Sequence, residues 1–131
     1  MTVTTVEAPL RTVYPIMRYR DPLTAAEWLT RVIGFTQKWI DRDPDGTITH
    51  IELVKDTGMV MFGVVKEGLN SSPGEGMYLA VEDVVGHYER AKAEGANIVY
   101  PPRDSEYGNG TQDFEVRDPE GRPWYIGSYR P

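Results

Sequence analysis

The clearest acid–base chemistry in the sequence comes from two side chains that stand close together. His50 and Glu52 lie two positions apart in an alternating run, residues 47–54, so both point to the same face of a predicted strand. An imidazole beside a carboxylate is a common pair for moving a proton. A solvated strand face with Lys55 close by gives the same pattern. The catalytic and the purely structural interpretation of this pair therefore both stay open.

Most other signatures of catalysis are absent from the sequence. It has no cysteine, which excludes disulfides, thiolate metal sites and a thiol nucleophile. It has no Ser–His–Asp order, no phosphate-cradling glycine loop and no dinucleotide fingerprint. The turn at residues 43–46 has some features of a calcium loop, but the further ligands are missing and ordinary turn chemistry explains it.

The elements that must position these side chains occur twice, at a spacing of just over sixty residues. Asp21 precedes a helix-like run that ends at Gly34, and Asp83 precedes another that ends at Gly95. After each helix come a strand-like run, a long connection, a second strand, a tight turn and a last apolar strand. Each half is therefore predicted to be strand, helix, then three strands.

The predicted strands cover residues 12–19, 35–41, 47–54, 59–65, 77–81, 97–100, 112–117 and 123–128, and the second helix covers 84–94. Pro15 places the first strand at a sheet edge or a bulge, because proline lacks the backbone donor of a central strand. By the repeat, Ile51 and Leu53 match Phe114 and Val116, and all four are predicted to lie in the core.

Composition indicates one globular domain over residues 1–131, with module one at about 11–65, a linker at 66–75 and module two at about 76–129. The net charge of −6 argues against a nucleic-acid partner and slightly favours a cationic ligand. The sequence shows neither a signal peptide nor a run of membrane-spanning length, so we expect a cytoplasmic protein without a membrane partner.

Two segments carry a resemblance to a known family: RYRDPLTAAEWLTRVIGF, and EYGNGTQDFEVRDPEGRPWYIGSYRP near the end of the chain. With the order of elements, they resemble the vicinal oxygen chelate superfamily, which includes glyoxalase I, the extradiol dioxygenases and the bleomycin-resistance proteins. The resemblance covers residues 11–129. It implies an α+β fold in which two βαβββ modules form a cupped, open, barrel-like mixed sheet with the helices outside.

The resemblance also implies where a divalent metal would be held, on the first and last strands of each module. Carried onto this chain, those positions are Tyr14, Met61, Gly76 and Tyr125. Metals of this class require imidazole and carboxylate ligands, and none of the four residues supplies either. We therefore predict no metal site and no cofactor.

The remaining cup would have aromatic walls, which suit a flat organic molecule better than bond-making. Glu115 faces into the cup as the repeat partner of Glu52, and Tyr107 lies in a glycine-flanked loop of the kind that often covers a cavity. The predicted ligand-binding residues are Tyr14, Trp39, His50, Glu52, Met61, Tyr78, Tyr107, Glu115 and Tyr125. We predict no catalytic residue.

Three functions stay open at this point. The first is a metal-free protein that binds and sequesters an antibiotic or an aromatic natural product, as bleomycin-resistance proteins do, with a homodimer implied by the resemblance. The second is a glyoxalase-like lyase or isomerase, or a dioxygenase-related enzyme, that uses acid–base residues such as His50, Glu52 or Glu115. The third is a domain of the same type that serves only in protein–protein contact.

Overall fold

Each half of the chain forms one βαβββ module in the computed structural model, which describes residues 13–65, 75–106 and 108–131. Module one consists of β1 (Ile16–Tyr19), α1 (Pro22–Trp28), the π-helical turn η1 (Leu29–Ile33), β2 (Thr36–Arg42), β3 (Ile48–Lys55) and β4 (Gly58–Val64). Module two consists of β5 (Met77–Ala80), α2 (Val84–Ala93), β6 (Asn97–Asp104), β7 (Gln112–Arg117) and β8 (Pro123–Gly127). The predicted α+β fold with two βαβββ modules is confirmed.

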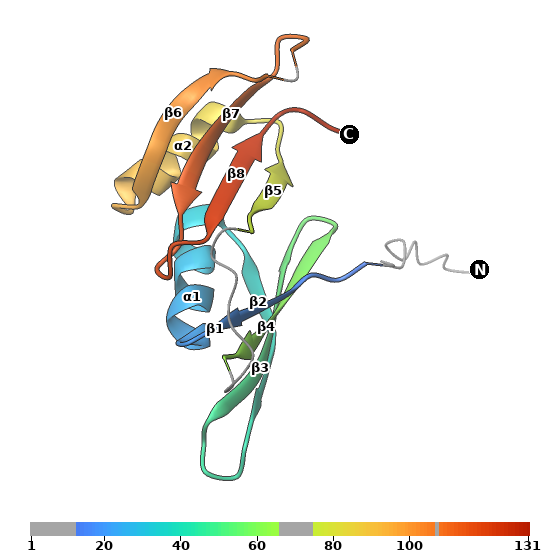
Figure 1. The fold of residues 1–131 in the computed structure, drawn as a ribbon, viewed down its shortest axis with the longest axis vertical. Helices are drawn as coiled ribbons and strands as arrows, with labels where there is room; N and C mark the ends of the chain where they lie inside the picture. Colours follow the sequence, from blue (N-terminus) through green and yellow to red (C-terminus); the bar gives the residue numbers. More distant parts are fainter. Residues whose placement is uncertain (1–12, 66–74, 107) are drawn as a thin grey trace, which may run out of the picture.

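The strands form two four-stranded sheets with the same topology. Their orders are β1-β4-β3-β2 and β5-β8-β7-β6, and in each sheet the first strand runs parallel to the last one while the other pairs are antiparallel. Module two lies above module one along the long axis of the molecule (Figure 1). The sheets are mixed and open, as the resemblance implied.

Local signals set the helix boundaries. Asp21 accepts a hydrogen bond from Thr24 N at 3.1 Å, and Asp83 accepts one from Gly86 N at 2.8 Å, so each aspartate caps the first turn of its helix. The first helix continues past Trp28 as a wider π-helical turn. Gly34 closes that turn with a φ of 99°, a backbone conformation that glycine adopts without strain.

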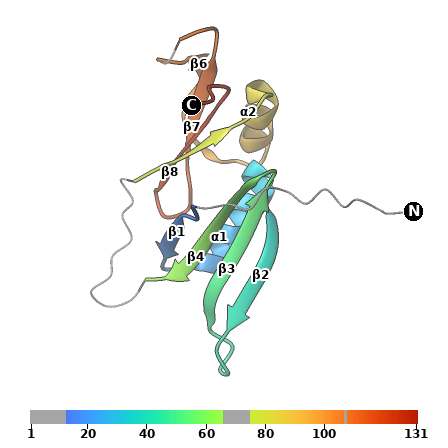
Figure 2. The same ribbon diagram turned by 90° about the vertical axis from the view of Figure 1, so that its right-hand side faces the viewer.

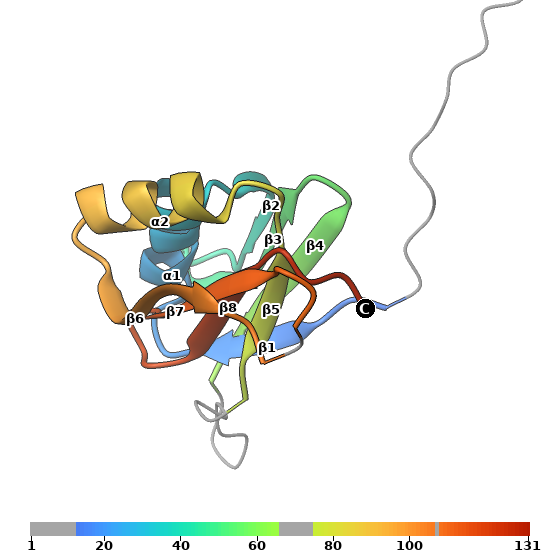
Figure 3. The same cartoon turned by 90° about the horizontal axis from the view of Figure 1, so that it is seen from above.

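One face of each sheet is buried against the helices. Ile51, Leu53, Phe114 and Val116 are fully buried, as predicted from the repeat. Figures 2 and 3 show α1 behind the sheet of module one, and both helices together on one side of the molecule. The opposite sheet faces are therefore the ones left open to a ligand.

The turn between β7 and β8 fastens the two modules together. The Glu120 carboxylate accepts hydrogen bonds from the backbone N–H groups of Arg20 and Asp21, at 2.8 and 2.9 Å, where module one enters its helix. Beside it, the Tyr19 hydroxyl donates to the buried carboxylate of Asp118. The turn thus fixes the orientation of module two relative to β1.

Two strand boundaries differ from the prediction by more than one residue. β1 begins at Ile16 rather than at residue 12, and it is an edge strand, as Pro15 indicated. The prediction that residues 101–104 form a loop was wrong, because β6 continues to Asp104. β6 is also an edge strand with register shifts, which is where Pro101 and Pro102 are tolerated. The predicted linker, apart from Glu75, lies outside the described residues.

Candidate ligand-binding site

Strand register places the predicted site residues of module two side by side. Tyr125 is in register with Tyr78 on one side and with Glu115 on the other, so the three side chains share one sheet face. Tyr100 on β6 continues the same row through its pairing with Glu115. This face lies opposite the one that packs against α2, since the alternate residues Phe114 and Val116 are buried.

Module one carries the matching row. Met61 is in register with Ile16 and Glu52, and Glu52 pairs with Trp39, so β1, β4, β3 and β2 each contribute one side chain. Ile16 is 61% exposed and Trp39 56% exposed, which are high fractions for side chains of this size and apolarity. His50 lies one row further along the same face, beside Gly63.

The register therefore collects the predicted residues in two groups, one on each sheet. Tyr14 precedes β1 and is 38% exposed. Tyr107 lies outside the described residues. The remaining seven stand on the open face of one sheet or the other.

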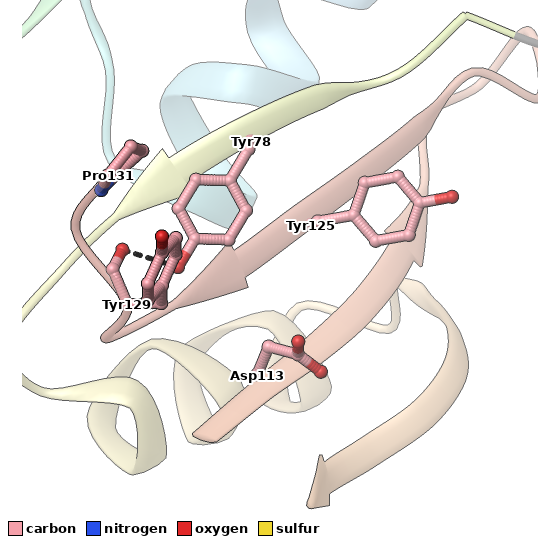
Figure 4. A pocket seen from close by; sticks show the side chains of 5 residues that line it. All are labelled: Tyr78, Asp113, Tyr125, Tyr129 and Pro131. Atoms are coloured by element: carbon pink, nitrogen blue, oxygen red, sulfur yellow. Dashed lines mark hydrogen bonds between the residues drawn. The ribbon is translucent and has the colours of Figure 1, made fainter. Parts of the chain in front are cut away.

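A cavity of about 300 Å³ opens on the face of module two (Figure 4). It is lined by Tyr78, Asp113, Tyr125, Tyr129 and Pro131. The Tyr78 ring lies across β8, and its hydroxyl donates a hydrogen bond to the Tyr129 carbonyl oxygen at 2.7 Å. This bond fixes one wall of the cavity.

A glycine makes room for that wall. A Cβ atom on Gly127 would stand 2.7 Å from the Tyr78 hydroxyl oxygen and 2.9 Å from Asp113 Cβ, both shorter than real contacts allow. The side chains of Tyr78 and Asp113 therefore both lie close to the Cα of residue 127, and only glycine fits there without displacing one of them.

A smaller cavity of about 150 Å³ adjoins the first and shares Asp113 and Tyr125 with it. Its other lining residues are Tyr100, Arg103 and Glu106. The Arg103 guanidinium lies over the Tyr100 ring, 3.5 Å from the ring centroid. Burial, and then the negative charge of Asp113 and a side-chain hydrogen bond to it, raise the pKa of Tyr100 to about 12.

Of the eight residues that line the two cavities, only Tyr78 and Tyr125 were predicted from the sequence. The repeat that matches Ile51 with Phe114 also matches His50 with Asp113, but Asp113 was not chosen as a site residue. The other five residues that were not predicted are Tyr100, Arg103, Glu106, Tyr129 and Pro131. The alternation of β7 already placed Asp113 on the same face as Glu115. That alternation was the signal that could have identified it.

The acid–base candidates are held in close side-chain pairs, one in each module. His50 Nε2 lies 3.0 Å from Glu52 Oε2, and both side chains are half-buried. In module two, the buried Glu115 accepts a hydrogen bond from Arg117 Nε at 2.7 Å. Because a guanidinium already occupies its carboxylate, Glu115 is poorly placed to take a proton from a ligand, and His50–Glu52 is the better acid–base pair.

The residues at the four family metal positions do not fit a divalent ion. Tyr14, Met61 and Tyr125 offer two phenols and a thioether, and Gly76 offers no side chain. Within the described ranges, no three His, Cys, Asp or Glu side chains come close enough to hold a metal ion. We therefore derive no chemistry from a metal at this face.

Comparison with known proteins agrees with the fold. The family model for the Glyoxalase/Bleomycin resistance protein/Dioxygenase superfamily matches residues 11–126, so the chain belongs to this superfamily. None of the curated proteins matches the chain. No helix in the described part of the chain is long and apolar enough to cross a membrane.

Solved structures show the same architecture. The chain is 33% identical to TioX from Micromonospora sp. ML1, covering 92% of this chain and 98% of that one with a TM-score of 0.70. A superfamily member from Sphaerobacter thermophilus is 17% identical, with 91% and 97% of the two chains covered and a TM-score of 0.73. A glyoxalase-related enzyme from Clostridium phytofermentans is 11% identical, with 92% and 95% covered and a TM-score of 0.75. The last two show a common fold only.

Proposed function

We propose that this protein binds and sequesters an aromatic small molecule, of the natural-product or antibiotic class, without a metal ion. The tyrosine-lined cavity on the open face of module two supports this most directly. Tyrosine rings give a large contact area at a small loss of conformational entropy. Its volume of about 300 Å³ is that of a small-molecule site.

A screen followed by recovery of the ligand tests this function. The protein is heated with a panel of aromatic natural products, and a compound that binds the native state raises the melting temperature. The bound compound is then released and its mass is measured. Recovery of the unchanged compound supports sequestration. A changed mass, in amounts that grow with time, would identify an enzyme instead.

An acid–base enzyme is the second candidate, and the His50–Glu52 pair favours it, since its two side chains lie 3.0 Å apart and remain partly accessible. In a glyoxalase-like lyase or isomerase, this pair would move a proton on the bound ligand. If it does, His50→Gln should abolish turnover and leave ligand binding nearly unchanged.

We also propose that the protein works as a homodimer in the cytoplasm. Three large apolar or aromatic side chains on the open faces are exposed, namely Ile16, Trp39 and Tyr78, and so is Tyr14 just before β1. A second copy that covers these faces would bury them and enclose the ligand. Light scattering that gives twice the chain mass supports this state, and a monomer mass at working concentration contradicts it. A cytoplasmic location is supported by a sequence without cysteine.

A further inference from the structure

The two cavities of module two share one carboxylate in their walls. Asp113 lines both of them, together with Tyr125. Its side chain is only 13% exposed, and its Oδ1 atom is buried and accepts no hydrogen bond from the described residues. A buried carboxylate oxygen without a donor is unfavourable. The Tyr100 hydroxyl interacts with the same carboxylate, but it is a neutral phenol and supplies no compensating charge.

In the described part of the chain, the cation paired with Asp113 is Arg103, and it compensates this charge only in part. Arg103 Nε lies 3.9 Å from Asp113 Oδ1, which is beyond hydrogen-bond distance. The Arg103 side chain is 55% exposed, and its guanidinium rests on the Tyr100 ring. Glu106, on the rim of the smaller cavity, adds a second negative charge. The cavity side of Asp113 therefore remains electronegative.

The other walls also suit a cation. Tyr78, Tyr125 and Tyr129 line the larger cavity, and the faces of aromatic rings attract positive charge. Figure 4 shows the Asp113 carboxylate on β7, below the rings that come from β5 and β8. A carboxylate combined with tyrosine rings recognises an organic ammonium group through both charge and ring contact.

We propose that the cavity of module two binds the protonated amine of an aromatic ligand, with Asp113 as its counter-ion. This inference rests on the proposed function and deepens it by assigning the charge of the ligand. Module one should not share this preference. His50 takes the place of Asp113 there, and it is already paired with Glu52 at 3.0 Å.

Three probes of similar size test the charge preference directly: 2-phenylethylammonium, 2-phenylethanol and phenylacetate. Each is titrated into the full chain at pH 7 while amide NMR shifts on β7 and β8 are followed. We expect the ammonium probe to bind roughly tenfold more tightly than the alcohol, and the anion to bind most weakly.

Two variants separate a local charge from the overall charge. Asp113→Asn keeps the shape of the side chain and should weaken binding of the ammonium probe roughly tenfold, with little effect on the alcohol. Asp104→Asn makes the same charge change at an exposed position on β6 that lines neither cavity, and should alter neither affinity. The salt dependence of probe affinity tests the same charge in the unaltered protein. Of the ammonium and the alcohol, only the ammonium should bind more weakly as the sodium chloride concentration is raised.

The outcomes distinguish this inference from the proposed function. Equal affinity for the ammonium and the alcohol, unchanged by Asp113→Asn or by salt, overturns the charge assignment but leaves the cavity as a binding site. Shifts that are absent for every probe also overturn it, and the natural-product screen then decides the proposed function alone. If Asp113→Asn does not fold, the salt dependence of the ammonium affinity carries the test.

Discussion

Gly76 and Tyr125, at two of the four family metal positions, are packed against each other. A Cβ atom on Gly76 would stand 2.9 Å from Tyr125 Cε2 and 2.9 Å from the Pro123 carbonyl oxygen. The missing side chain at one position therefore makes room for the aromatic ring at the other. The glycine and the ring are therefore complementary, and the Tyr125 ring forms part of the cavity wall.

Gly76→Ala should displace the Tyr125 ring and strain the end of β8. Because the backbone oxygen of Pro123 cannot move freely, we expect a loss of about 1–3 kcal/mol in the free energy of unfolding. Chemical denaturation measures this loss. A variant as stable as the unaltered protein, with the same ligand affinity, would show that the ring moves without consequence.

Gly127→Ala and Gly63→Ala form a matched pair, since the two glycines occupy repeat-related positions near the ends of β8 and β4, opposite Asp113 and His50. The Cβ at 127 would collide with Tyr78 and Asp113, whereas the Cβ at 63 would meet only Arg18 Cγ at 3.9 Å, an ordinary contact. We expect Gly127→Ala to lower the melting temperature and to abolish probe binding at the cavity. Gly63→Ala should leave both unchanged, and equal effects of the two variants would contradict this difference.

The stability of the folded chain should be sensitive to alkali because two tyrosines have raised pKa values, Tyr19 at the junction between the modules and Tyr100 on β6. Burial, and then the charge of Asp118, raise the pKa of Tyr19, and burial and Asp113 raise that of Tyr100 to about 12. In the unfolded chain these tyrosines ionise near pH 10, while in the folded chain they stay protonated. The unfolded state therefore loses protons first, and the free energy of unfolding should fall as pH rises above about 10.

Tyr19→Phe removes the Tyr19 part of this dependence. At neutral pH it should lower the free energy of unfolding by about 1–2 kcal/mol, because Asp118 loses one donor but keeps its bond from Trp124 Nε1 at 3.2 Å. Between pH 9 and pH 11 the slope of stability against pH should become shallower. Tyr88→Phe is the control. It also removes one tyrosine hydroxyl, but from a ring on α2 that packs edge-on against Phe114. An unchanged slope in Tyr19→Phe would place the alkaline sensitivity elsewhere.

We expect no stoichiometric divalent metal in the purified protein, because Tyr14, Met61, Gly76 and Tyr125 do not form a ligand set. Metal analysis after dialysis without chelator should find far less than one zinc, nickel, iron or manganese ion per chain, and added chelator should not change the melting temperature. About one ion per chain that survives dialysis contradicts this expectation.

The parts of the fold that were predicted correctly depend on local signals. The caps Asp21 and Asp83 follow from residue type and position, and the core positions Ile51 and Phe114 follow from strand alternation within a repeat. The end of β6 was missed because two prolines usually end a strand, but here the strand lies at a sheet edge.

The cavity could not be predicted in the same way. Its shape depends on Tyr78 crossing β8 at Gly127, a contact between strands that are far apart in the sequence. The repeat was also misleading at one point. It equated Asp113 with His50, although one faces a cavity and the other is held by Glu52. Equivalent positions in the two modules have different roles because their neighbours differ.

The last prediction concerns the tyrosine that both cavities share. Tyr125→Ala removes a ring that lines the two cavities but packs against Gly76 rather than within the buried core. We expect the affinity for an aromatic ligand from the screen to fall by about 1–3 kcal/mol, a roughly five- to hundredfold change. The melting temperature without ligand should change little, because a partly exposed ring on an open sheet face contributes little core packing.

Val85→Ala is the control for Tyr125→Ala, since it shortens an exposed apolar side chain on α2, away from the sheet face. Calorimetric titration of the unaltered protein and both variants measures the change. If Tyr125→Ala binds like the unaltered protein while Trp39→Ala does not, the ligand lies on the face of module one. If Tyr125→Ala unfolds instead, the ring is part of the structural core, and the cavity loses its main support as a binding site.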